Sequence, residues 1–158
     1  MNVKYLSVLF VGDDAFDTDE GYQGKGQFLF AMTGAQGNHG TEMDSKTNGN
    51  FDSMPRSHPA FYSMTIIGGG SGGRTGGLMR LREGTGGKFG NVILTNPTDI
   101  GVRISACGQE AVTQTLPASS VSIGVSGDGA TDGYLYFSSN NIIAGASQTI
   151  RLDCTPKP

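Results

Sequence analysis

The sequence contains no tryptophan and only two cysteines, and its hydrophobic residues make up 36% of the chain when glycine is left out. No apolar run approaches the roughly 18 residues that a membrane-spanning helix needs. Basic residues are also scarce, with 11 lysines and arginines against 14 acidic residues and a net charge of -3. Surfaces that bind nucleic acid concentrate positive charge. We therefore expect no nucleic-acid partner and no membrane span.

The two cysteines, Cys107 and Cys154, allow a single pairing, and the sequence leaves open whether they form a disulfide or remain two thiols. No CxxC pair and no Cys/His spacing of the zinc type is present, so a structural zinc site is not expected. The first residues, MNVKYLSVLFVGDD, are too short and too strand-like for a signal peptide. The chain is therefore expected to be mature, cytoplasmic or a segment of a longer protein, and we favour the last because Val3 begins as if in the middle of a strand.

Glycine is abundant: 26 of the 158 residues are glycine, against a usual share of roughly 7%. Each glycine inside a helix costs about 1 kcal/mol relative to alanine, so helices are disfavoured. The glycines punctuate β-branched and aromatic runs and lack the period of collagen. This pattern predicts one all-β domain over residues 1–158, made of many short strands.

Ten segments rich in β-branched and aromatic residues are predicted strands. They are Val3–Val11, Gln27–Thr33, Phe61–Ile67, Leu78–Arg82, Asn91–Thr95, Gly101–Ala106, Val121–Val125, Tyr134–Phe137, Asn141–Ala144 and Thr149–Leu152. Several alternate, so that Val102 and Ile104 face one way while Arg103 faces the other. Units of strand, corner and strand recur loosely, as in VLFVGDD, MTIIGGG, VILTNPTD and VRISACG. Loose repetition of this kind is typical of stacked solenoid coils.

This repeated pattern of strand, corner and strand, with corners such as GDDAFDTDEG, resembles right-handed parallel β-helices of the pectate-lyase-like superfamily. It also resembles secreted or surface-anchored bacterial proteins of that fold. The resemblance implies a right-handed parallel β-helix of about five to six coils. Residues 3–106 would form regular coils and residues 107–158 less regular last coils or a cap. It also implies an extracellular or cell-surface location, and exposed solenoid ends suit homo-oligomers. The expected core rungs are Leu6, Val8, Phe28, Phe30, Ile66, Leu81, Ile93 and Ile104.

Five carboxylates follow the first predicted strand within Gly12–Gly24. In an extended chain Asp17 and Asp19 point to the same face, and converging carboxylates recruit a cation. Oxygen ligands on an irregular loop suit Ca²⁺, which predicts a calcium site at Asp17, Asp19 and Glu20. The alternative is a solvated corner whose aspartates cap backbone amides.

Two further polar clusters stand out. The stretch GNHGTEMDS carries His39, which would be a general base, a ligand or a surface turn residue, together with Glu42 and Asp44. Strand alternation puts Arg80 and Arg82 on one face, where they would bind carboxylates or phosphate, or would neutralise nearby acids.

The order of GDD at 12–14, NHG at 38–40 and RLR at 80–82 is similar to the GDD, GHG and RIK motifs of the polygalacturonase family. That resemblance implies an inverting hydrolase. Asp13 would be the general acid and Asp14 the base toward water, His39 would position them, and Arg80 and Arg82 would hold substrate carboxylates. The sequence departs from that pattern in having no acidic residue before Asp13.

Two functions follow from these patterns. The first is a non-enzymatic secreted or surface module with a structural role or a glycan or protein partner, and with bound Ca²⁺. The alternative is a polysaccharide-active enzyme, either a hydrolase or a lyase. The enzyme requires Asp13, Asp14, His39, Arg80 and Arg82 to meet on one face of adjacent coils.

Overall fold

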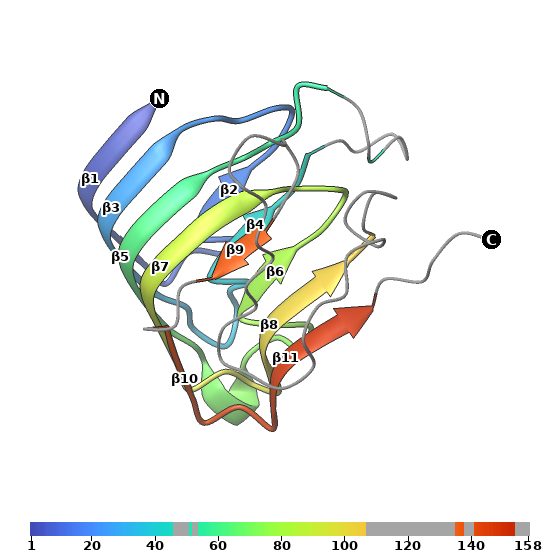
Figure 1. The fold of residues 1–158 in the computed structure, drawn as a ribbon. Helices are drawn as coiled ribbons and strands as arrows, with labels where there is room; N and C mark the ends of the chain where they lie inside the picture. Colours follow the sequence, from blue (N-terminus) through green and yellow to red (C-terminus); the bar gives the residue numbers. More distant parts are fainter. Residues whose placement is uncertain (46–50, 52–53, 107–134, 138–140, 154–158) are drawn as a thin grey trace.

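The computed structural model describes residues 1–45, 51, 54–106, 135–137 and 141–153. Apart from a 3-10 turn at Gly70–Gly72, the regular structure of these residues is β-strand (Figure 1). None of them forms a helix long and apolar enough to cross a membrane.

The strands form two parallel sheets, between which the chain passes back and forth. Sheet A has the order β1-β3-β5-β7-β10, with β9 also paired to β7, and sheet B has the order β11-β8-β6-β4-β2. Sheet A contains β1 (Asn2–Leu9), β3 (Lys25–Met32), β5 (Ala60–Ile67), β7 (Gly87–Thr95), β9 (Leu135–Phe137) and β10 (Ile142–Ala144). Sheet B contains β2 (Phe16–Thr18), β4 (Thr41–Met43), β6 (Met79–Leu81), β8 (Ile100–Ser105) and β11 (Gln148–Asp153). The described residues thus form a parallel β-helix, as predicted, and pass through sheet B five times.

Nine of the ten predicted strands fall on observed ones, and Val121–Val125 lies outside the described residues. The sequence pattern missed β2 and β4, which we had expected to be an acidic corner and a polar turn. Both are three-residue strands with an acid in the middle, and they pair with each other in register. Each gains a backbone ladder from the next coil, which stabilises a strand too short to show a pattern by itself.

A column of residues in the left-handed conformation divides the long strands of sheet A. Tyr5, Phe28, Ser63 and Asn91 all have φ between 53° and 58°, and the register places them side by side on four successive coils. A residue in this conformation between two extended segments shifts the in-out alternation by one position. The rings of Tyr5 and Phe28 consequently stack outside the sheet, with centroids 5.1 Å apart.

This shift explains which core predictions were wrong. Of the predicted rungs, the structure buries Ile66, Leu81 and Ile104, half-buries Val8 and Phe30, and exposes Leu6, Phe28 and Ile93. Phe28 lies in the left-handed column, and Ile93 pairs with Thr65 in an outward row. Leu6 is aligned with the buried Leu29 but belongs to the first described coil, so no coil covers it from the other side.

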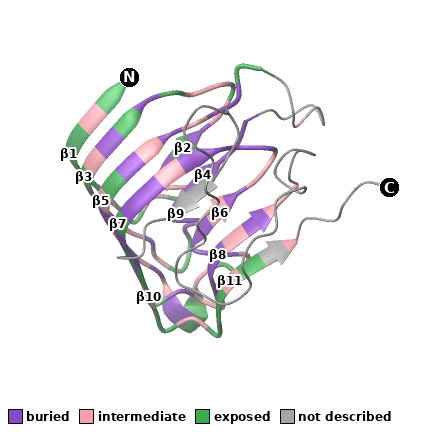
Figure 2. Cartoon of the chain, viewed as in Figure 1, coloured by how far each residue is buried: buried purple, intermediate pink, exposed green. Residues whose placement is uncertain are grey.

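The core lies between the inward faces of the two sheets (Figure 2). Methionines contribute much of it, with Met43 and Met79 from sheet B and Met64 from sheet A fully buried. Flexible thioether side chains fill irregular gaps. The core therefore closes although the sequence has no tryptophan.

The isoleucines at 66 and 93 form a matched pair for testing this arrangement. We expect Ile66→Ala to lower the free energy of unfolding by about 2–5 kcal/mol, because it opens a cavity in a fully buried site. Ile93→Ala should cost about 1 kcal/mol or less, because that side chain is 38% exposed. Urea denaturation followed by circular dichroism measures both. Equal losses would contradict the shifted alternation.

Candidate functional site

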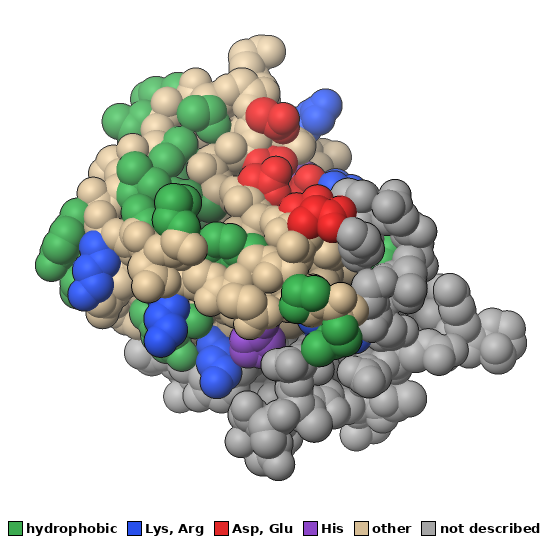
Figure 3. Space-filling model, turned by 90° about the horizontal axis from the view of Figure 1, so that it is seen from above, with side chains coloured by type: hydrophobic (Ala, Val, Ile, Leu, Met, Phe, Trp, Pro, Cys, Tyr) green, Lys and Arg blue, Asp and Glu red, His purple; other side chains and the backbone are tan. Residues whose placement is uncertain are grey.

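A row of charged side chains crosses the outer face of sheet B. Backbone pairing aligns Asp17 with Glu42, Glu42 with Arg80, Arg80 with Arg103, and Arg103 with Arg151. We call these five residues the charged row. Each coil contributes one member, so acids on the first two coils meet arginines on the next three. Figure 3 shows the acidic side chains gathered in one region of the surface.

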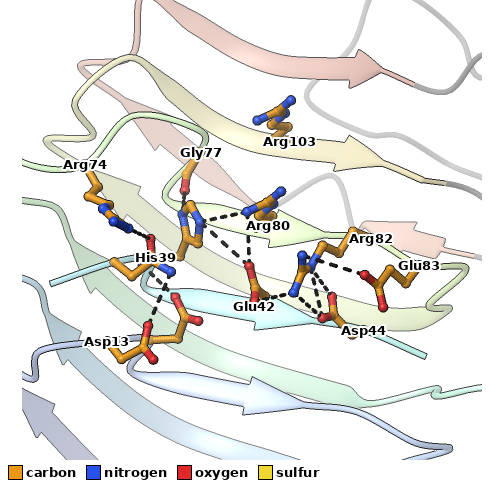
Figure 4. A network of polar contacts seen from close by, with 12 residues as sticks. Asp13, His39, Glu42, Asp44, Arg74, Gly77, Arg80, Arg82, Glu83 and Arg103 are labelled. Carbon is orange, nitrogen blue, oxygen red and sulfur yellow. Dashed lines mark hydrogen bonds and ion pairs between the residues drawn. The ribbon is translucent and has the colours of Figure 1, made fainter. Parts of the chain in front are cut away.

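We number the coils by their sheet B strands in chain order, so that β4 lies on coil two and β6 on coil three. Glu42 and Asp44 on coil two are bound by arginines from coil three (Figure 4). Arg82 places Nε 2.9 Å from both carboxylate oxygens of Asp44 and Nη2 2.7 Å from Oε2 of Glu42. Arg80 places Nη1 3.3 Å from Oε1 of Glu42. Both acids are more than nine-tenths buried, so these pairings have little competition from water.

His39 is held beside Glu42 in a single orientation. Its Nδ1 lies 2.6 Å from the carbonyl oxygen of Gly77, which only accepts, so the proton is on Nδ1. The unprotonated Nε2 then faces Glu42 Oε1 at 3.8 Å and Arg80 Nη1 at 3.4 Å. Burial lowers the pKa of His39, which keeps the ring neutral. Gly77 has a φ of 103°, and a Cβ there would lie 2.8 Å from the Cβ of Arg103, so this position requires glycine.

The loop before β2 stacks on the loop before β4 and brings Asp14 into the site. Asp14 Oδ1 accepts the backbone N–H of His39 at 2.7 Å, and the backbone N–H of Asn38 donates to the carbonyl of Asp13. The potential ligand atoms of Asp14, His39 and Glu42 all lie within 4.8 Å of one another. The Asp13 side chain is exposed and contacts Asn38.

Burial raises the pKa of two carboxyl groups in this site. The pKa of Glu42 rises from 4.5 to about 7, because burial and the charge of Asp14 outweigh the opposing effect of Arg82 and Arg80. The pKa of Asp44 rises from 3.8 to about 6, again chiefly through burial. A carboxyl group with a pKa near 7 can both give and take a proton at neutral pH.

Asp14, His39 and Glu42 have the donor atoms for a divalent metal. The Arg80 guanidinium, however, already lies 3.3 to 3.4 Å from Glu42 and His39. It supplies the positive charge that these groups favour, so a metal would have to displace it.

The structure places the five predicted catalytic residues on adjacent coils. It brings Asp14, His39, Arg80 and Arg82 together, whereas Asp13 points to solvent. The sequence placed Glu42 and Asp44 in a polar cluster but not among the catalytic residues, although the alternation in TEMD is that of a strand with both acids on one face. The prediction also left out Arg103 and Arg151. The outward position of Arg103 was visible between Val102 and Ile104.

A family model described as a pectate-lyase-like β-helix domain matches residues 1–132. The chain belongs to this family. Neither the curated proteins nor the solved structures gave a match. The match covers the coils of this pectate-lyase-like domain that carry Asp14, His39, Glu42, Arg80 and Arg103.

The calcium site at Asp17, Asp19 and Glu20 stays a prediction. Asp19 Oδ1 accepts the backbone N–H of Glu20 at 2.6 Å, which is the capped corner given as the alternative. If calcium binds here, 1 mM Ca²⁺ will raise the melting temperature over that in EGTA, and Asp17→Asn will abolish the rise. Equal melting temperatures in Ca²⁺ and EGTA would leave only the capped corner.

The raised pKa of Glu42 predicts a pH-dependent stability. The folded chain holds this proton more tightly than the unfolded chain, so its stabilising effect is complete below pH 4.5 and is lost as pH rises through about 7. Melting temperatures measured from pH 4.5 to 7.5 should therefore fall less in Glu42→Gln than in the wild type. The exposed Gln148→Ala, which removes no titratable group, is the control and should keep the wild-type slope. A wild-type slope in Glu42→Gln would show that this carboxyl has an ordinary pKa.

Proposed function

We propose that this pectate-lyase-like domain binds and cleaves an acidic polysaccharide on the outer face of sheet B. The proposal rests on the environment of Glu42. This carboxyl has a raised pKa, pairs with Arg80 and Arg82, and lies beside Asp14. An acid of this kind next to guanidinium groups suits a substrate that carries its own carboxylates.

The arginines of the charged row would hold the polymer. Arg80, Arg103 and Arg151 lie on successive strands, about 4.8 Å apart. Asp153 accepts from the Nε atoms of both Arg103 and Arg151 at 2.8 Å. Their terminal Nη nitrogens are left to meet substrate carboxylates in bidentate fashion.

Glu42 would act as the general acid. A substrate carboxylate that pairs with Arg80 draws this guanidinium from Glu42 and removes an interaction that lowers the Glu42 pKa. Glu42 is then protonated and gives its proton to the glycosidic oxygen. Neutral His39 lines the same site through Nε2 and accepts a hydrogen bond from a sugar hydroxyl.

Asp14 would act on the sugar carbon. One of its oxygens lies within 4.8 Å of one oxygen of Glu42, which is nearer the roughly 5 Å separation of the carboxyl groups in retaining enzymes than the 6.5–9.5 Å of inverting ones. This pair suits retention of configuration: Asp14 attacks the sugar carbon while Glu42 protonates the leaving oxygen, and the Glu42 carboxylate then takes a proton from the water that hydrolyses the resulting ester. The resemblance to polygalacturonases instead implies inversion with Asp13 and Asp14, so the stereochemistry of the product distinguishes the two pairs.

The experiment is to incubate the protein with polyuronates and with neutral polymers and to measure new reducing ends. We expect cleavage of a polyuronate only, and a rate about 10²–10⁴-fold lower in Glu42→Gln, the usual contribution of a general acid. Glu20→Gln is the matched carboxyl-to-amide control and should keep the wild-type rate. A folded wild-type protein that cleaves no acidic polymer would overturn the catalytic part.

A non-enzymatic glycan-binding module is the second candidate. It is favoured by the pairing of Arg80 and Arg82 with Glu42 and Asp44, which leaves the cluster internally neutralised. In that case polyuronate binds without cleavage, and Glu42→Gln changes only stability. Both candidates place the domain outside the cell or on its surface, where such polymers occur, and both allow association through the solenoid ends.

A further inference from the structure

A groove of about 570 Å³ lies on the outer face of sheet A, away from the charged row. Its walls include three lysines, Lys4, Lys25 and Lys88, and the polar side chains of Gln27 and Tyr62. These residues come from β1, β3, β5 and β7, so the groove runs across four coils. Nothing in the proposed catalytic chemistry uses them.

The backbone register builds the shape of the groove. Lys25 pairs with Ala60, and Ala60 pairs with Lys88, so the two lysines lie in one outward row on either side of a small side chain. They are two strand spacings apart, roughly 9–10 Å along the solenoid. Lys4 and Tyr62 belong to the neighbouring outward row, where both align with Gln27. The lysines thus flank a hollow floored by Ala60.

Among the described residues, the three lysines differ from the arginines of sheet B because no carboxylate forms an ion pair with them. Within the described part of the chain, no carboxylate lies at ion-pair distance from Lys4, Lys25 or Lys88. In the same part of the chain, Arg80, Arg82, Arg103 and Arg151 each have an acidic partner. In a protein with a net charge of -3, three lysines that no described carboxylate neutralises are a local concentration of positive charge suited to an anion.

We propose that this groove is a second binding site for an acidic oligosaccharide. The ammonium groups would pair with carboxylates spaced along the sugar chain, Gln27 would bond to hydroxyls, and the ring of Tyr62, 38% exposed, offers an apolar platform for a sugar face. The choice of a sugar over another polyanion rests on the proposed function. A polymer held here would keep its neighbouring segments at high effective concentration for the outer face of sheet B.

The test is the affinity of the whole chain for a short uronate oligosaccharide, measured by calorimetry in the background of Glu42→Gln to prevent cleavage. We expect Lys25→Gln with Lys88→Gln to weaken binding at the groove about tenfold, the loss of two exposed charge pairs. Lys25→Arg with Lys88→Arg keeps the charge and should stay within about twofold of the parent. A control with the same net charge change, Gln36→Glu with Gln148→Glu at exposed positions outside the groove, should also bind as the parent does.

Each outcome decides the inference independently of catalysis. A sheet B site acting alone would lose affinity in Arg80→Gln and keep it in the double lysine variant, which would overturn the groove. Equal loss in the lysine variant and in the charge-matched control would show only a general electrostatic effect and would also overturn it. If single-stranded DNA binds more tightly than the uronate and its binding depends on the lysines, the ligand of the groove is a nucleic acid and not a sugar. Lysine-dependent binding of the uronate, together with a wild-type protein that cleaves no uronate, would support the groove and refute only the enzyme.

Discussion

The in-register parallel pairing of successive coils is the constraint on which the rest of this structure depends. In a parallel ladder each residue lies directly over its counterpart in the next coil, so side chains far apart in sequence form continuous rows. Asp17, Glu42, Arg80, Arg103 and Arg151 make such a row on sheet B. The same rule makes the lysine groove on sheet A. Shifting one coil by one residue would turn its charged side chains into the core.

The electrostatics of sheet B follow from this stacking. Two buried acids on coil two would be costly without a cation, and coil three supplies Arg80 and Arg82 at the matching positions. Burial still dominates, so Glu42 keeps a pKa near 7 in spite of two guanidinium neighbours. A ligand that competes for the arginines would therefore raise the pKa of Glu42 further.

The sequence predicted the architecture better than the site. The long strands of sheet A and β8 are readable because each carries enough β-branched and aromatic residues to show a pattern. The strands β2 and β4 are not, because three residues with a central acid look like a polar corner until a neighbouring coil pairs with them. The left-handed column was also hidden, since Tyr5 and Phe28 are not residues that signal a positive φ. Glu42 and Asp44 were recognised as part of a polar cluster but were given no catalytic role, because their partners lie on another coil, at a distance along the chain that uneven insertions conceal.

A double-mutant cycle between Glu42 and Arg82 tests most directly whether coils two and three stack in this register. The two side chains meet at 2.7 Å, and both are largely removed from solvent. Unfolding free energies of Glu42→Gln, Arg82→Gln and the double variant should give a coupling energy of about 0.5–3 kcal/mol, as for residues in direct contact. A coupling energy of zero would mean that Glu42 and Arg82 are not neighbours, and would contradict the stacking from which the site was built.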